Sequence, residues 1–128
     1  MMVTDILIEP VSGEFDIAEI EAYLTAQPHT ARDEHAPEHF MIASSDEGLE
    51  EAREARRGDP RRFPTNVILV EVGATCTGIY YRIPPVAPAR RFAEWLRTRY
   101  EVRFMDDGFR DLTSECRENL DYLFGAPE

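Results

Sequence analysis

Three histidines and the carboxylates around them are the residues of this chain best suited to chemistry. His35 and His39 lie within the stretch RDEHAPEHF among three carboxylates, and His29 lies just upstream. Zinc proteases place H-E-x-x-H on a helix, where both imidazoles share one face and the Glu lies beside the attacking water. In this chain Glu38 occupies the wrong slot, and Pro37 disfavours a helical residue before it. The zinc-protease motif is therefore excluded.

A looser metal site is an alternative that the sequence leaves open. A bent loop could place three nitrogens and one oxygen around zinc, from His29, His35 and His39 with Asp33 or Glu34. Because a loop imposes no fixed spacing, the default interpretation is a solvent-exposed loop without metal. The alternative function is a small metal-dependent enzyme or metal-binding protein.

Other spacings that resemble catalytic motifs do not lie in the required structural context. Cys76 and Arg82 have the C-x5-R spacing of cysteine-dependent phosphatases, but CTGIYYR is typical of a strand, which separates the two residues by roughly 20 Å. Asp106 and Asp107 precede a glycine, which is common turn chemistry, and Asp111 suits a helix N-cap. No phosphate-binding glycine loop or nucleophile elbow occurs. The sequence identifies no catalytic residue and favours a protein that is not an enzyme.

Charge is distributed unevenly along the chain. The net charge is -11, and residues 1–51 hold 13 acids against Arg32 alone. All 14 basic residues are Arg. Excess negative charge opposes binding to nucleic acid and anionic lipid, and it attracts basic partners at long range. The acidic N-terminal part is the strongest indication of function in the sequence.

The N-terminus and the two cysteines suggest a compartment. MMVTDILIEP lacks a basic region, and the longest apolar run elsewhere is only VILV, so we expect no export signal and no membrane segment. Cys76 and Cys116 lack the spacing of a metal or redox motif. We expect reduced thiols in a cytoplasmic protein, of bacterial origin.

The pattern of hydrophobic and capping residues predicts alternating strands and helices in a single globular domain, residues 1–128. Asp16 with Glu19 forms a capping box, as does Ser44 with Glu47, and each marks a helix start. Strands are typical of the segments rich in β-branched and aromatic residues. The expected strands are Val3–Glu9, His39–Ala43, Asn66–Val72, Thr77–Ile83 and 101–105, and the expected helices are 17–27, 45–58, Ala89–Tyr100 and 112–125.

This order, β-α-β-α-β-β-α-β-α, predicts the α+β class, with helices packed on one mixed or antiparallel sheet. The best topology is ferredoxin-like, with one additional helix before the 66–83 hairpin and another at the end. Because many unrelated functions share that fold, it does not identify the activity.

The function that best accounts for these features is a protein-binding module that docks a basic protein. A stoichiometric inhibitor, such as an immunity protein that neutralises a bacterial toxin, has this size and charge. The expected contacts are carboxylates of the N-terminal part with aromatic residues at the centre: Glu19, Glu21, Asp33, Glu34, Asp46, Glu47, Glu50 and Glu51. A third alternative is a small-ligand binder in a cleft around Tyr80 and Arg82.

Overall fold

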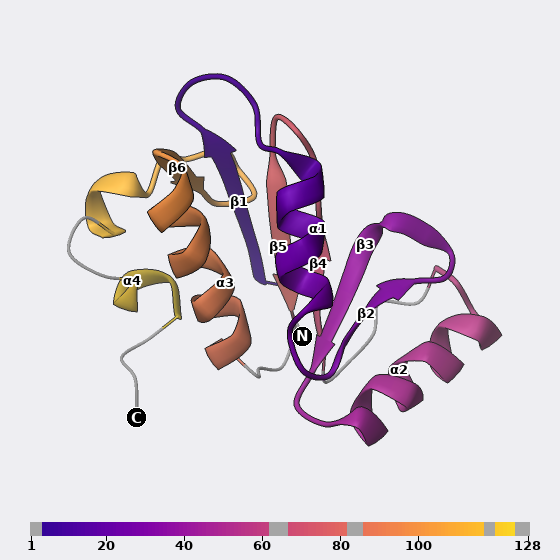
Figure 1. Cartoon of the computed structure of the whole chain (residues 1–128). Helices are drawn as coiled ribbons and strands as arrows, with labels where there is room; N and C mark the ends of the chain where they lie inside the picture. Colours follow the sequence, from indigo (N-terminus) through magenta and orange to yellow (C-terminus); the bar gives the residue numbers. More distant parts are fainter. Residues whose placement is uncertain (1–3, 62–66, 82–85, 117–119, 125–128) are drawn as a thin grey trace.

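A computed structural model of the chain describes residues 4–61, 67–81, 86–116 and 120–124. In this part of the chain, six strands form one antiparallel sheet, accompanied by four α-helices and a 3-10 helix (Figure 1). The α+β class predicted from the sequence is confirmed. In chain order the elements are β1 (Thr4–Pro10), α1 (Ile17–Thr25), β2 (Thr30–Asp33), β3 (Ala36–Ala43), α2 (Asp46–Gly58), β4 (Val67–Glu71), β5 (Thr77–Tyr81), α3 (Val86–Arg99), β6 (Val102–Met105), η1 (Thr113–Cys116) and α4 (Asp121–Phe124).

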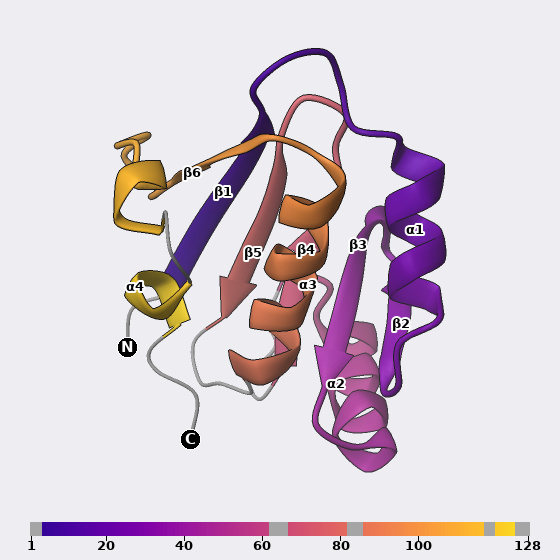
Figure 2. The same ribbon diagram turned by 60° about the vertical axis from the view of Figure 1, so that its left-hand side comes forward.

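The strand order across the sheet is β2-β3-β4-β5-β1-β6, and every neighbouring pair is antiparallel. The exact ferredoxin-like topology is not confirmed, because this order differs from it. The difference arises where the sequence predicts a histidine loop followed by a short strand. That segment is a hairpin of β2 and β3 with its turn at residues 34–35, and it extends the sheet at one edge (Figure 2). The loop prediction is therefore wrong.

The first strand and the first helix agree with their sequence patterns. Ile6 and Ile8 of β1 are buried, as their alternation predicts. The N-cap of α1 is Asp16, whose Oδ1 accepts a hydrogen bond from the Glu19 N–H at 3.3 Å. Ile17, which the pattern places on the buried stripe, is instead exposed.

The predicted 66–83 hairpin is confirmed for its described part, because β4 and β5 pair in antiparallel register. Gly73 lies in the connection, where a Cβ atom would lie 2.5 Å from the Cys76 carbonyl oxygen. Only glycine allows this close approach of two backbone segments. On α3 the predicted stripe, represented by Phe92 and Leu96, is buried, and so is Phe104 of β6.

Each predicted helix differs from the structure at one or both of its ends; α1 ends at Thr25, and α3 spans Val86–Arg99 where Ala89–Tyr100 was expected. The N-cap of α2 is Ser45, one residue later than predicted, and its Oγ accepts from the Gly48 N–H at 3.0 Å. The predicted last helix is instead η1 and the short α4, between which residues 117–119 lie outside the described part. Asp111 does cap this region, because its Oδ1 accepts from the Thr113 N–H at 2.9 Å.

The helices cover the two faces of the sheet unequally. α1 and α3 lie side by side on one face, with Tyr23 of α1 stacked on Trp95 of α3 at 4.3 Å between ring centroids (Figures 1 and 2). Of the described helices, only α2 packs on the other face, over β3 and β4, where Leu49 and Ala52 meet Met41 and Leu69. No helix in the described part is long and apolar enough to cross a membrane.

Candidate functional site

The solvent-facing side of α2 carries three carboxylates in a row. Leu49 and Ala52 of this helix are buried against the sheet. Residues four and three positions apart lie on one side of a helix, so Glu47, Glu51 and Glu54 lie together on the opposite side. All three are exposed. The ion pairs of α2 among the described residues involve its other acids, so these three, the α2 acidic face, are open to a partner.

Beside this face, Arg57 joins α2 to the tip of the β2–β3 hairpin. Its Nη2 lies 2.7 Å from Oε1 of Glu34, and its Nη1 lies 3.3 Å from Oε1 of Glu50. The hydrogen bond from Arg57 lowers the pKa of Glu34. All three side chains are about half exposed, so water screens these pairs and each contributes little to stability. Both carboxylates can therefore exchange Arg57 for a basic group of a partner.

Asp33, which the sequence places among the contact residues, is buried at 2% exposure. It pairs with Arg56 of α2, itself 8% exposed, and its Oδ1 accepts from the His35 N–H at 2.9 Å. This ion pair connects the β2–β3 hairpin to α2. Asp33 thus lies beneath the surface, where its carboxylate is paired within the fold.

Glu19 and Glu21 lie apart from the other predicted acids. They belong to α1, which covers the face of the sheet opposite α2. Glu21 forms an ion pair with Arg32 of β2. Of the eight predicted acids, the structure brings together the six on α2 and the hairpin: Asp33, Glu34, Asp46, Glu47, Glu50 and Glu51.

The three histidines do not converge on one site. His29 precedes β2 and its Nδ1 lies 2.8 Å from Asp46; His39, on β3, has Nε2 2.9 Å from Glu71. His35 lies in the hairpin turn, 3.5 Å from Asp33. His35 and His39 are four residues apart along extended chain, which corresponds to about 13 Å.

Each histidine therefore has a carboxylate partner of its own. Among the described residues, no three His, Cys, Asp or Glu side chains gather closely enough to hold a metal ion. The zinc alternative is not supported, because the segment assumed to be a flexible loop is a hairpin that keeps the imidazoles apart.

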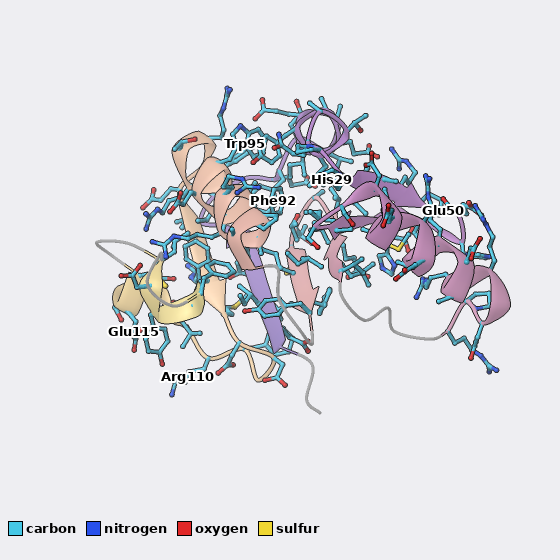
Figure 3. The ribbon with its side chains drawn as sticks, turned by 90° about the horizontal axis from the view of Figure 1, so that it is seen from below. His29, Glu50, Phe92, Trp95, Arg110 and Glu115 are labelled. Atoms are coloured by element: carbon cyan, nitrogen blue, oxygen red, sulfur yellow. The ribbon has the colours of Figure 1, made fainter. Side chains whose placement is uncertain are left out.

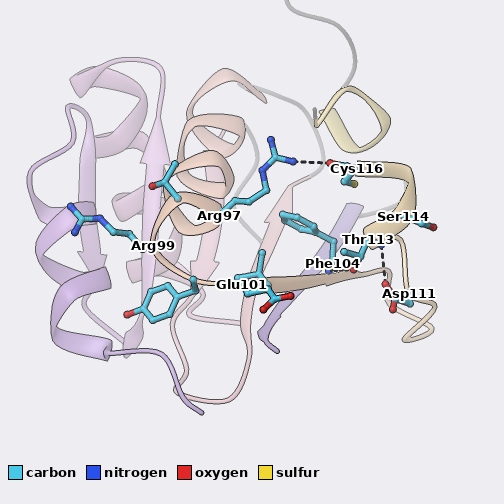
Figure 4. A pocket seen from close by; sticks show the side chains of 11 residues that line it. Arg97, Arg99, Glu101, Phe104, Asp111, Thr113, Ser114 and Cys116 are labelled. Atoms are coloured by element: carbon cyan, nitrogen blue, oxygen red, sulfur yellow. Dashed lines mark hydrogen bonds between the residues drawn. The ribbon is translucent and has the colours of Figure 1, made fainter. Parts of the chain in front are cut away.

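A groove of about 980 Å³ lies between the C-terminal end of α3, β6 and η1 (Figure 4). Two pairs of its lining residues are hydrogen-bonded: Arg97 Nη1 donates to the Cys116 carbonyl oxygen at 2.7 Å, and Asp111 accepts from the Thr113 N–H. Burial raises the pKa of the Cys116 thiol, which keeps it neutral and a poor nucleophile.

No protein-family model matches this chain, and neither a curated protein nor a solved structure matches it.

The sequence prediction of contact residues omits Glu54, although its spacing from Glu51 indicates that both lie on the same side of the helix. It assigned no role to Asp5. The small-ligand alternative pairs Tyr80 with Arg82, which lies outside the described residues.

Proposed function

We propose that this protein is a binding module that docks a basic protein partner through α2 and the β2–β3 hairpin. The observation that carries this proposal is the α2 acidic face, three exposed carboxylates that make no ion pair within the described structure. Like charges one helical turn apart repel, at a cost of about 0.2–0.5 kcal/mol per pair. Glu51 and Glu54 therefore do not serve the stability of α2, whereas a basic partner would relieve their repulsion.

Long-range attraction supports the same role. The chain carries a net charge of -11, and α2 concentrates acids at the surface. Complementary charge mainly accelerates association and selects the correct partner, while central, desolvated side chains supply most of the affinity. A cytoplasmic inhibitor of the immunity type, bound one-to-one to a basic bacterial toxin, is the specific form of partner binding that we favour.

The proposal is tested by capturing companions of the tagged full-length chain from its own cells at low and high salt. The variant Glu47→Gln, Glu51→Gln, Glu54→Gln removes three charges from α2. The control Glu14→Gln, Glu101→Gln, Glu115→Gln removes three exposed charges elsewhere. We expect one basic companion that high salt weakens, that the α2 variant loses, and that the control retains. Absence of such a companion, or equal retention by both variants, would contradict the proposal.

A further inference from the structure

The face of the sheet on which α2 packs is only partly covered. α2 lies over β3 and β4, and no described helix lies over β5, β1 and β6 on this side (Figure 3). Asp5 and Leu7 of β1 and Tyr80 of β5 point to this side and are partly exposed. We refer to these three residues as the open sheet face. It adjoins α2, so a partner drawn to the α2 acidic face arrives beside it.

The Tyr80 side chain lies against Gly78, two residues earlier on the same strand, β5. A Cβ atom on Gly78 would lie only 2.3 Å from the Tyr80 hydroxyl, so the ring lies over the glycine and its hydroxyl extends toward Glu71. Burial, followed by the charges of Glu71 and Asp5, raises the pKa of Tyr80 to about 12. The hydroxyl therefore stays neutral, and the ring presents a fixed aromatic surface beside carboxylates.

Asp5 lies next to Tyr80 and has no ion-pair partner among the described residues. The two residues are register partners in the β1–β5 ladder. Oδ1 of Asp5 is buried and has no hydrogen-bond partner in the described structure, and Asp107 adds a second negative charge nearby. By contrast, the neighbouring Glu71 is paired with His39 at 2.9 Å. Buried polar atoms usually have a hydrogen-bond partner, so this oxygen is able to accept a hydrogen bond from an added donor.

Resting on the proposed function, we propose that the open sheet face receives an arginine side chain of the basic partner. Its guanidinium donates to Asp5 and stacks on Tyr80, and its methylene stem lies on Leu7. Arginine fits better than lysine because a planar guanidinium can stack on an aromatic ring while its fork of N–H groups reaches a carboxylate.

The charge of this face argues against other occupants. An apolar side chain would bury the Asp5 carboxylate further without a donor, which costs free energy. A second copy of the chain would bring another net charge of -11 against the first. A metal ion lacks the ligands it needs, because the described part of the chain holds no group of three candidate ligands.

The test uses the full-length chain with N-acetyl-arginine amide as the probe, followed by amide chemical shifts in an NMR titration. N-acetyl-lysine amide and N-acetyl-leucine amide are titrated in parallel. We expect the arginine probe to shift the amides of Asp5, Leu7, Gly78 and Tyr80 with a dissociation constant in the millimolar range, and the other two probes to bind more weakly.

Paired variants separate the contacts from the fold. Asp5→Asn and Tyr80→Leu should each weaken the arginine probe by about tenfold, the equivalent of one lost charged contact. Glu14→Gln removes a distant charge, so it should bind as the wild type does. Amide spectra of each variant verify that it is folded.

Three results would overturn the inference: equal binding of the lysine or leucine probe, shifts confined to other regions, or unchanged affinity in Asp5→Asn. These results leave the proposed function intact if companion capture still depends on the α2 acidic face. Conversely, probe binding at Asp5 without any captured companion would contradict the proposed function and support the arginine site alone.

Discussion

At the level of single residues, Asp33 and Asp5 show two opposite environments for a carboxylate on the same sheet. Asp33 is fully buried, but Arg56 and the His35 N–H balance its charge. Asp5 keeps some contact with solvent, yet one of its oxygens is buried without a donor. Asp33 therefore belongs to the stability of the fold, whereas Asp5 is suited to an external cation.

Removing Arg56 should destabilise the protein strongly, because it leaves the Asp33 carboxylate buried beside no guanidinium. Breaking a buried pair on one side typically costs about 3–5 kcal/mol. We expect that loss in the free energy of unfolding of Arg56→Met, measured by urea denaturation. The double variant Asp33→Asn, Arg56→Met should lose less, and a single-variant loss below about 1 kcal/mol would show that the pair does not fasten the hairpin.

Asp5→Asn should stabilise the protein at neutral pH. Burial and the charge of Asp107 raise the pKa of Asp5, so the folded state holds this proton more tightly than the unfolded chain does. Stability is consequently lost as the pH rises from the ordinary Asp range through the raised pKa. Because Asp5 is partly solvated, we expect a gain of about 0.5 kcal/mol at pH 7.

The gain from Asp5→Asn should disappear near pH 3, where the carboxyl is protonated in both states. Thermal unfolding of the variant and the wild type between pH 3 and pH 7 measures this difference in stability. A variant that is less stable than the wild type at pH 7 would mean that Asp5 has a stabilising partner, which contradicts the open site.

At the level of elements, some strands of the sheet have a clear pattern in the sequence and others do not. The hairpin of β4 and β5 could be predicted because VILV and GIYY place apolar residues in short runs bounded by glycine and polar residues. β2 could not be predicted, because its inward positions are Ala31 and Asp33. The inward-facing Asp33 carboxylate is explained by its hydrogen bond from Arg56, which lies 23 residues away in sequence.

The candidate site, like the sheet, could be predicted only in part from the sequence. Local charge density indicated α2, and helical spacing could have added Glu54. Pairing across elements could not be read from the sequence, so it did not reveal that Arg57 engages Glu34 or that Glu21 lies on the opposite face. The environment of Asp5 likewise depends on the register of β1 with β5, which places it beside Tyr80.

Within α2, Glu51→Gln should raise the stability of the protein. Glu51 lies one turn from Glu47 and from Glu54, so its neutralisation removes two repulsive pairs, worth about 0.5 kcal/mol together. Glu47→Gln should gain less, because a carboxylate in the first turn also interacts favourably with the helix dipole. Urea denaturation compares the two variants, and a destabilised Glu51→Gln would show that this acid has a structural role.

On β5, Gly78→Ala should displace the Tyr80 ring, because the new Cβ would lie 2.3 Å from its hydroxyl. Exposing the ring to water should lower the pKa of Tyr80 from about 12 toward 10, and binding of N-acetyl-arginine amide should weaken. Ultraviolet titration measures the pKa, with Tyr80→Phe identifying the signal. An unchanged titration would mean that the ring does not depend on the glycine.

At the level of the whole molecule, the charge that is concentrated in the N-terminal sequence is divided between the two sides of the sheet. Part of it lies on α1, and the larger group lies on α2 and the hairpin, adjoining the open sheet face (Figure 3). This arrangement is consistent with a binding surface in which acids at the margin guide association and Tyr80 anchors the centre.

The most direct test of the central claim is the affinity of the purified companion for the wild type, the α2 triple variant and the charge-matched control. We predict that the α2 variant binds about tenfold more weakly than the control at low salt, and that the difference narrows in 1 M salt, where the Debye length falls to about 3 Å. Equal affinities of the two variants at low salt would contradict the claim that α2 docks a basic partner.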